Sequence, residues 1–147
     1  MVTLEEFQAK TGGRLDALDV TDAVAEVVTG SGVAEGVALV YCPHTTCCVV
    51  VSSSRTQTLE AVERLMAMVA PAHHYYEHDD LSVRTENLME DEPPNAPAHI
   101  AHIFMGKTSE SIPIIRGELA LGGGQRVFLV ELDSSRERRY CVQVVGE

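Results

Sequence analysis

The chain has 147 residues, of which 45% are hydrophobic and 22% charged, and this composition predicts one globular domain over residues 1–147. A formal net charge of −11 argues against non-specific binding to nucleic acids or anionic membranes, which needs clustered Lys and Arg. No segment approaches the roughly 20 apolar residues of a membrane span, and the acidic N-terminus lacks a signal-peptide pattern. We therefore expect a cytoplasmic protein with no nucleic-acid partner and no membrane partner.

The N-terminal region predicts two short strands followed by a helix. The strands are expected over 4–9 and 14–20, because a Thr-Gly-Gly turn signal separates these two segments. Thr21 or Asp22 is expected to cap the helix, whose valines share one face, and Gly30 is expected to end it.

Two apolar runs of strand length come next, over 37–42 and 47–51. The corner Pro43-His44-Thr45-Thr46 joins them, and we expect the runs to be neighbouring buried strands. The four cysteines of the chain show no C-x-x-C spacing and lie in strand-like segments, which predicts buried free thiols in a reducing compartment.

The middle of the chain predicts the clearest helix, from Thr56 to Ala70, with apolar residues at three- and four-residue spacing and Pro71 as its stop. The polar stretch 79–97, which includes the acidic segment Glu86–Glu92, predicts an exposed, mobile loop. Residues 98–105 are compatible with a short helix closed by Gly106 or with a strand.

Three further strands are expected over 111–115, 126–133 and 139–145, and the glycines 122–124 join two of these elements. Short strands interrupted by helices, with hairpin-length links near the end, predict an α+β fold. Its sheet should curl rather than form a doubly wound parallel sheet.

Three histidines from separate segments are the strongest chemical signal. Taken singly, His44 fits a turn histidine bonded to a neighbouring threonine, His78 fits a solvated loop histidine, and His99 fits a capping residue. Taken together, they match the count of three protein ligands that leaves one coordination position open at a catalytic zinc ion. Zn²⁺ suits imidazole ligands, whereas Mg²⁺ would require a shell dominated by carboxylates, so the divalent ion stays open.

Two polar turns are weaker candidates for anion binding. The segment Gly122-Gly123-Gly124-Gln125-Arg126 is either a tight turn between strands or a backbone cradle for phosphate, and it matches no known nucleotide fingerprint. The segment 107–111, which contains Ser109, offers hydroxyl groups and one ammonium, a combination that is common in turns.

The ordered set of motifs along the chain resembles the YjbQ family of small bacterial and archaeal proteins, called secondary thiamin-phosphate synthases. The motifs that carry this resemblance are Pro43-His44-Thr45-Thr46, Tyr76-Glu77-His78-Asp79, Asn95-Ala96-Pro97-Ala98-His99, Ser109 with Ile112-Pro113-Ile114, Gly117–Gly122 with Gln125, and Glu131, Asp133, Arg136 and Arg138.

The resemblance implies a bifurcated, mostly antiparallel sheet that forms a pseudo-barrel with two main helices, and a homotrimer. It implies a metal held by His44, His78 and His99, and an activity that joins a pyrimidine pyrophosphate to a thiazole phosphate. On this basis Glu131 and Asp133 are the candidate acid/base or metal-supporting groups. The candidate substrate-binding residues of this small phosphorylated molecule are Asn95, Ser109, Gln125 and Arg136.

The chain departs from the usual family pattern at several places, two of which bear most on the function. Ser52-Ser53-Ser54 stands where Asn-Glu-Asn is typical, and Gly123-Gly124 replaces a Thr-Trp pair. These differences favour an alternative, a non-catalytic module that binds a small anionic metabolite. A metal-dependent phosphate-ester hydrolase that uses Glu131 as its base is a third interpretation.

Overall fold

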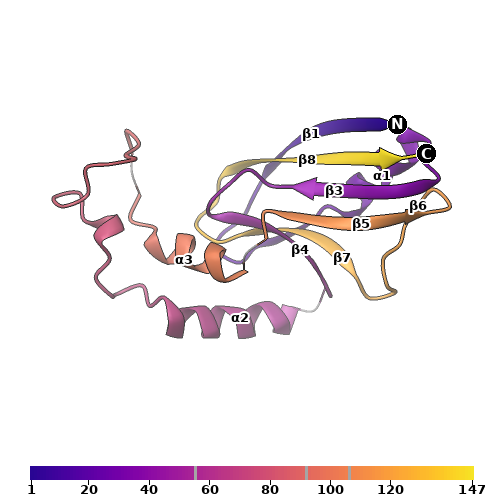
Figure 1. Cartoon of the computed structure of the whole chain (residues 1–147). Helices are drawn as coiled ribbons and strands as arrows, with labels where there is room; N and C mark the ends of the chain where they lie inside the picture. The colour runs from indigo at the N-terminus through magenta and orange to yellow at the C-terminus, as the bar shows by residue number, and fades with distance from the viewer. Residues whose placement is uncertain (55, 92, 106) are drawn as a thin grey trace.

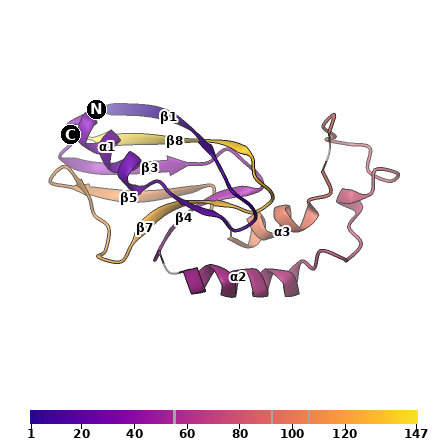
Figure 2. The same cartoon turned by 180° about the vertical axis from the view of Figure 1, so that it is seen from behind.

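In the computed structural model, which describes residues 1–54, 56–91, 93–105 and 107–147, all strand pairs are antiparallel and form two sheets. The five-stranded sheet has the order β1-β8-β3-β5-β6, and the three-stranded sheet has the order β2-β7-β4. Figures 1 and 2 show how the sheets curl toward each other as a half-barrel, which confirms the predicted α+β class. The strands are β1 (Val2–Lys10), β2 (Ala17–Asp19), β3 (Glu35–Tyr41), β4 (Cys47–Ser52), β5 (Ser109–Ile115), β6 (Glu118–Leu119), β7 (Arg126–Glu131) and β8 (Glu137–Gly146).

The described residues form three α-helices and one 3₁₀ turn: α1 (Thr21–Ser31), α2 (Thr56–Val69), η1 (Glu77–Asp79) and α3 (Ala96–Met105). The prediction of α2 is confirmed, and the ambiguous segment near 98–105 is helical. The expected stop at Gly106 and the end of the acidic segment at Glu92 lie outside the described residues.

The first helix is longer than expected at its C-terminal end. It ends at Gly32, which adopts φ 70°, rather than at Gly30, because a left-handed residue is what closes the last turn. Its N-cap is Val20, and Thr21 is instead held by Asp19, whose Oδ1 accepts the Thr21 hydroxyl at 2.6 Å.

The prediction that 37–42 and 47–51 are neighbouring strands is wrong. β3 pairs with β5 and β8 in one sheet, whereas β4 pairs with β7 in the other. The corner 43–46 therefore carries the chain from one sheet to the other at the open end of the half-barrel. β3 and β4 follow each other in the sequence and contribute residues to the same core, but they do not pair with each other by hydrogen bonds.

The main core lies between the inner faces of the two sheets and is closed by the valines of α1. A second cluster lies on the other face of the three-stranded sheet, beneath α2 and α3. β7 takes part in both, since Val127 and Leu129 face the main core while Phe128 and Val130 face the helices. Burial on both faces explains why the sequence of this strand is continuously apolar.

The cysteines confirm the expected free thiols, with one difference. All four are free, and Cys42, Cys47 and Cys48 are fully buried, whereas Cys141 is only partly covered. Burial raises the pKa of Cys48 to about 12, which leaves this thiol protonated and unreactive.

Two glycines give a matched test of the packing between β3 and β8. A Cβ atom at Gly36 would overlap the Val145 carbonyl oxygen, whereas a Cβ at Gly30 on α1 would meet nothing within 4 Å. We expect Gly36→Ala to lower the free energy of unfolding by about 1–3 kcal/mol through overpacking. Gly30→Ala should raise it by roughly 0.5–1 kcal/mol through helix propensity. Urea unfolding measures both, and equal effects would contradict the close approach at Gly36.

Candidate functional site

The corner between the sheets, the start of β8, and the segment from η1 to α3 enclose a pocket of about 980 Å³. Residues far apart in the sequence meet here. The pocket is lined by five of the predicted site residues: His44, His78, Asn95, His99 and Arg136. The three histidines of the sequence-based hypothesis thus share one cavity.

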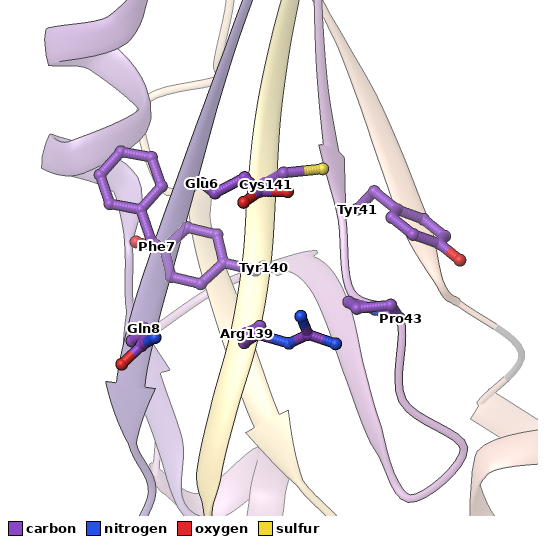
Figure 3. Close-up of a pocket in the computed structure, with 8 residues that line it drawn as sticks. All are labelled: Glu6, Phe7, Gln8, Tyr41, Pro43, Arg139, Tyr140 and Cys141. Atoms are coloured by element: carbon purple, nitrogen blue, oxygen red, sulfur yellow. The ribbon is translucent and has the colours of Figure 1, made fainter.

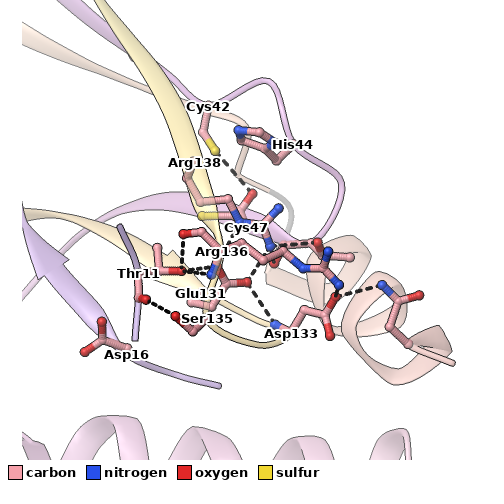
Figure 4. Close-up of polar contacts among 12 residues, drawn as sticks. Thr11, Asp16, Cys42, His44, Cys47, Glu131, Asp133, Ser135, Arg136 and Arg138 are labelled. Atoms are coloured by element: carbon pink, nitrogen blue, oxygen red, sulfur yellow. Dashed lines mark hydrogen bonds and ion pairs between the residues drawn. The ribbon is translucent and has the colours of Figure 1, made fainter. Parts of the chain in front are cut away.

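Arg138, which lines this pocket, belongs to a buried ion pair with Glu131. Arg138 is 5% exposed and Glu131 is fully buried, and the guanidinium donates to both carboxylate oxygens of Glu131, with Arg138 Nε 2.8 Å from Oε2 (Figure 4). Thr11 Oγ1 donates to the same carboxylate at 2.6 Å. Arg138 Nη2 also donates to the Thr46 hydroxyl at 2.9 Å, so the pair fixes the corner that carries His44.

Glu131 is the best-satisfied carboxylate of the site. Burial is the largest influence and raises its pKa, but the hydrogen bonds from Arg138 and Thr11 outweigh burial and hold the pKa below its usual value. Glu131 does not line the pocket, and its oxygens are already engaged. The geometry therefore argues against the predicted acid/base role, and we interpret Glu131 as a residue that positions Arg138.

Asp133 also lies behind the pocket, where one oxygen positions two lining residues. Its Oδ2 accepts from Asn95 Nδ2 at 2.8 Å and from Arg136 Nη2 at 2.7 Å. Among the described residues, Asn95 Oδ1 and Arg136 Nε are buried atoms without a hydrogen-bond partner. An unmade bond at a buried polar atom costs about 1–3 kcal/mol, so this pair of atoms calls for a partner.

His44 is held in one orientation by β8. The backbone N–H of Arg139 donates to His44 Nε2 at 2.9 Å, which places the proton of the neutral ring on Nδ1. Burial, followed by the charges of Arg138 and Arg139, lowers the pKa of His44 below its ordinary value of 6.5.

We expect His44 to stay neutral, with its proton on Nδ1, at pH 6.5 and above. Long-range ¹H–¹⁵N NMR spectra recorded during a pH titration should show this tautomer, and a midpoint below 6.5. His44→Gln identifies the signal by removing it. A midpoint above 6.5 would mean that burial and the charges of Arg138 and Arg139 do not lower the pKa of this ring.

His78 and His99 lie side by side, with ring centroids 4.7 Å apart. Asp79 Oδ1 is 2.7 Å from His78 Nδ1 and also accepts the Ala96 backbone N–H at 3.0 Å. One carboxylate thus orients the imidazole and anchors the start of α3. A histidine whose Nδ1 faces a carboxylate is the arrangement common at metal-binding histidines.

The three histidines do not form a complete metal site as they stand. Within the described ranges, no three His, Cys, Asp or Glu side chains converge on a point that could hold an ion. His44 is the residue that does not fit, because its Nε2 lone pair is used by the Arg139 N–H and its Nδ1 carries the proton.

Two predicted substrate-binding residues lie elsewhere. Gln125 Oε1 accepts the Gly122 N–H at 2.8 Å and closes the turn before β7, at the opposite end of that strand from Glu131. Ser109 begins β5 opposite Tyr41 and is exposed. Neither residue lines the pocket within this chain.

Arg84 organises the acidic loop over the pocket. Its guanidinium donates to the backbone carbonyls of His78 at 3.1 Å, Glu86 at 3.2 Å and Asn87 at 2.6 Å. Glu90 and Asp91, which follow on this loop, also line the pocket. The loop predicted over residues 79–97 thus contains turns whose backbone carbonyls accept hydrogen bonds from the Arg84 guanidinium.

Sequence reasoning gave no role in the site to Thr11 or Thr46, and it named Arg138 only in the basic run 136–139 and among the residues that carry the family resemblance. A usable signal existed for Arg138, because it begins the inward-facing series that continues with Tyr140 and Val142, and a cation on a buried strand face requires a partner. Thr11 lay in what was interpreted as a turn, and no periodicity indicates its contact with Glu131.

A smaller cavity of about 390 Å³ adjoins the corner on the five-stranded sheet (Figure 3). Tyr41, Arg139 and Cys141 line it, and Pro43 is shared with the larger pocket. It contains none of the predicted site residues. The larger pocket is therefore the candidate site.

Comparison with known proteins places these features in a family. The family model described as UPF0047 protein YjbQ-like matches residues 5–147. A UPF0047 protein of Archaeoglobus fulgidus is 33% identical over 95% of this chain and 99% of its own length, and one of Methanothermobacter thermautotrophicus is 27% identical over 99% and 94%.

Solved structures agree with this result. A YbjQ-like protein of unknown function from Sulfolobus solfataricus P2 superposes with a TM-score of 0.86 at 26% identity, covering 100% of this chain and 99% of that chain. A hypothetical protein from Aeropyrum pernix K1 gives a TM-score of 0.82 at 32% identity, covering 99% of both chains. The chain belongs to the YjbQ family, UPF0047.

Proposed function

We propose that this protein binds a small phosphorylated molecule in the pocket between His44, Arg136 and His99. The observation that carries the proposal is the unpartnered Arg136 Nε in a pocket that Arg138 also lines. Guanidinium groups match phosphate oxygens in geometry and charge. Arg138 is neutralised by Glu131, whereas Arg136, with 37% of its side chain exposed, retains surface for a ligand.

The test is a titration of the wild-type protein with inorganic pyrophosphate, followed by ¹H–¹⁵N NMR. We expect saturable shift changes at residues 43–46 and 135–138, with sodium chloride at matched ionic strength as the control. Shifts that chloride reproduces, or shifts that centre on the remote Arg126, would contradict a phosphate site in this pocket.

An enzymatic role is supported by the histidine pair and rests on the family resemblance. When bound, a divalent metal would supply charge stabilisation for a leaving pyrophosphate, as joining a pyrimidine pyrophosphate to a thiazole phosphate requires. His78 and His99 would hold the ion, Asp79 orients His78, and Arg136 binds phosphate oxygens. His44, neutral and fixed by β8, would face the substrate instead.

Elemental analysis of purified variants tests the metal. We expect near-stoichiometric zinc or another transition metal in the wild type, and its loss in His78→Ala and His99→Ala. The matched control is His44→Ala, which removes an imidazole from the same pocket and should retain the metal, since His44 Nε2 is already engaged. Loss in all three variants would restore the three-histidine site, and metal in none, wild type included, would exclude a metal role.

Two other functions use the same pocket. A non-catalytic module would bind phosphorylated molecules without turnover, an interpretation that the departures from the family pattern at residues 52–54 and 123–124 favour. A phosphate-ester hydrolase would need a base, and the buried ion pair of Glu131 speaks against that residue. Product analysis with the coupled substrates separates the synthase from the module.

A homotrimer is also proposed, on the basis of uncovered apolar surface. Val37, Tyr41 and Val145 lie on the outer face of the five-stranded sheet with 40% or more of each exposed, and Met68 of α2 is 81% exposed. Patches of this kind mark interaction surfaces. Sedimentation analysis should give three times the mass of 16.0 kDa, and a monomer at micromolar concentration would contradict the proposal.

A further inference from the structure

The two unpartnered atoms of the pocket have opposite hydrogen-bonding character. Arg136 Nε is a donor, and Asn95 Oδ1 is an acceptor, because the amide nitrogen of Asn95 is used on Asp133. Both side chains bond the same oxygen, Asp133 Oδ2, so they are fixed next to each other at the wall of one pocket. A fully ionised phosphate group offers acceptors only, so it can satisfy Arg136 but gives Asn95 no donor.

We infer that the ligand carries a protonated amine close to its phosphate, so that the amine donates to Asn95 Oδ1 while the phosphate accepts from Arg136. This inference rests on the proposed phosphate site and names its substrate class. Asn95 is then the residue that selects among phosphorylated molecules. Asp133 is a positioning residue that sets the spacing between the two recognition groups.

The distribution of charge selects an amine over a neutral hydroxyl. Arg136 and Arg138 line the pocket from the start of β8 and the segment before it, whereas Glu90 and Asp91 line it from the loop that leads toward Asn95; Lys10, Arg84 and Glu137 line it as well. A ligand that is anionic at one end and cationic at the other matches both sides. A purely anionic ligand would face the two carboxylates unfavourably.

The test compares ligands of one size in the wild-type protein. O-phosphoethanolamine, 2-hydroxyethyl phosphate and ethyl phosphate share a two-carbon phosphate ester and differ only in the donor. By calorimetry we expect O-phosphoethanolamine to bind at least about tenfold more tightly than ethyl phosphate, as a hydrogen bond to a charged group provides, with the hydroxyl compound between them. Asn95→Leu should weaken this preference, which is taken as the ratio of the two affinities within the variant because Asn95 and Arg136 share Asp133 Oδ2.

The outcomes separate the two proposals. Equal affinity for O-phosphoethanolamine and ethyl phosphate would overturn the amine inference and leave the phosphate site standing. A preference for the hydroxyl compound would overturn the choice of an amine. No binding of any of the three would overturn the phosphate site, and the inference with it. Because the ligand comparison uses the wild type, it holds even where Asn95→Leu fails to fold.

Discussion

Replacing Glu131 by Gln should lower the free energy of unfolding by about 3–5 kcal/mol, although the change removes only a charge and keeps the size of the side chain. Arg138 is 5% exposed, and without the carboxylate its guanidinium would be a buried charge with no counter-ion. Breaking a buried pair from one side costs this much because the remaining ion keeps its desolvation penalty. Chemical denaturation of both proteins measures the difference.

Two comparisons isolate the ion pair from general packing. Glu137→Gln removes a carboxylate from the next strand along the chain, but Glu137 faces Lys10 at 3.6 Å with both side chains about 70% exposed, so the change should stay under about 1 kcal/mol. The double variant Glu131→Gln, Arg138→Met should recover part of the lost stability, because no charge is then buried. An effect of Glu131→Gln as small as that of Glu137→Gln would mean that the pair is not desolvated.

The same pair predicts how stability depends on pH. The folded pKa of Glu131 lies below its ordinary value of 4.5, so the folded state favours the ionised carboxylate. Its contribution is fully present above about pH 4.5 and is lost as the pH falls through the lower folded value. The wild type should therefore lose stability below pH 4.5 more steeply than Glu131→Gln does.

Local patterns were enough to predict most elements of the fold, but not which strands pair. The three- and four-residue spacing of Leu59, Val62 and Met66 identifies α2, and the apolar run of β7 identifies a strand buried on both faces. The pairing of β3 with β8 rather than with β4 depends on how a four-residue corner turns. Nothing in that corner's composition specifies the sheet to which the next strand is added.

The site was predictable as a list of residues but not as a set of roles. The histidines and Arg136 do share a pocket, yet their bonding partners lie far away in the chain. The partner of His44 Nε2 is the backbone of Arg139, 95 residues later, and Glu131 binds Thr11 across 120 residues. Every residue except proline has a backbone N–H, so the residue type at position 139 does not indicate a bond to His44. The sequence therefore could not show that His44 Nε2 is already engaged.

The largest functional effect should come from Arg136→Met, which keeps the apolar stem of the side chain and removes the guanidinium. Arg136 is the pocket arginine with exposed surface and an unpartnered donor, whereas Arg138 is committed to Glu131 and Thr46. Charge-assisted hydrogen bonds contribute about 1.5–3 kcal/mol, so pyrophosphate should bind roughly 10- to 100-fold more weakly. Calorimetry of wild type and variant at one salt concentration measures the ratio.

Arg126→Met is the control that distinguishes a direct contact of pyrophosphate with Arg136 from long-range electrostatic attraction by the whole protein. Arg126 bonds Asp19 at 2.7 Å and Asp22 at 3.1 Å at the start of β7, outside the pocket. Both substitutions make a net charge of −11 one unit more negative, so both change long-range attraction of an anion alike. Equal weakening in the two variants would mean that pyrophosphate responds to net charge alone. Weakening confined to Arg136→Met would locate the phosphate at the guanidinium that Asp133 holds in place, since only that residue differs in its contact with the pocket.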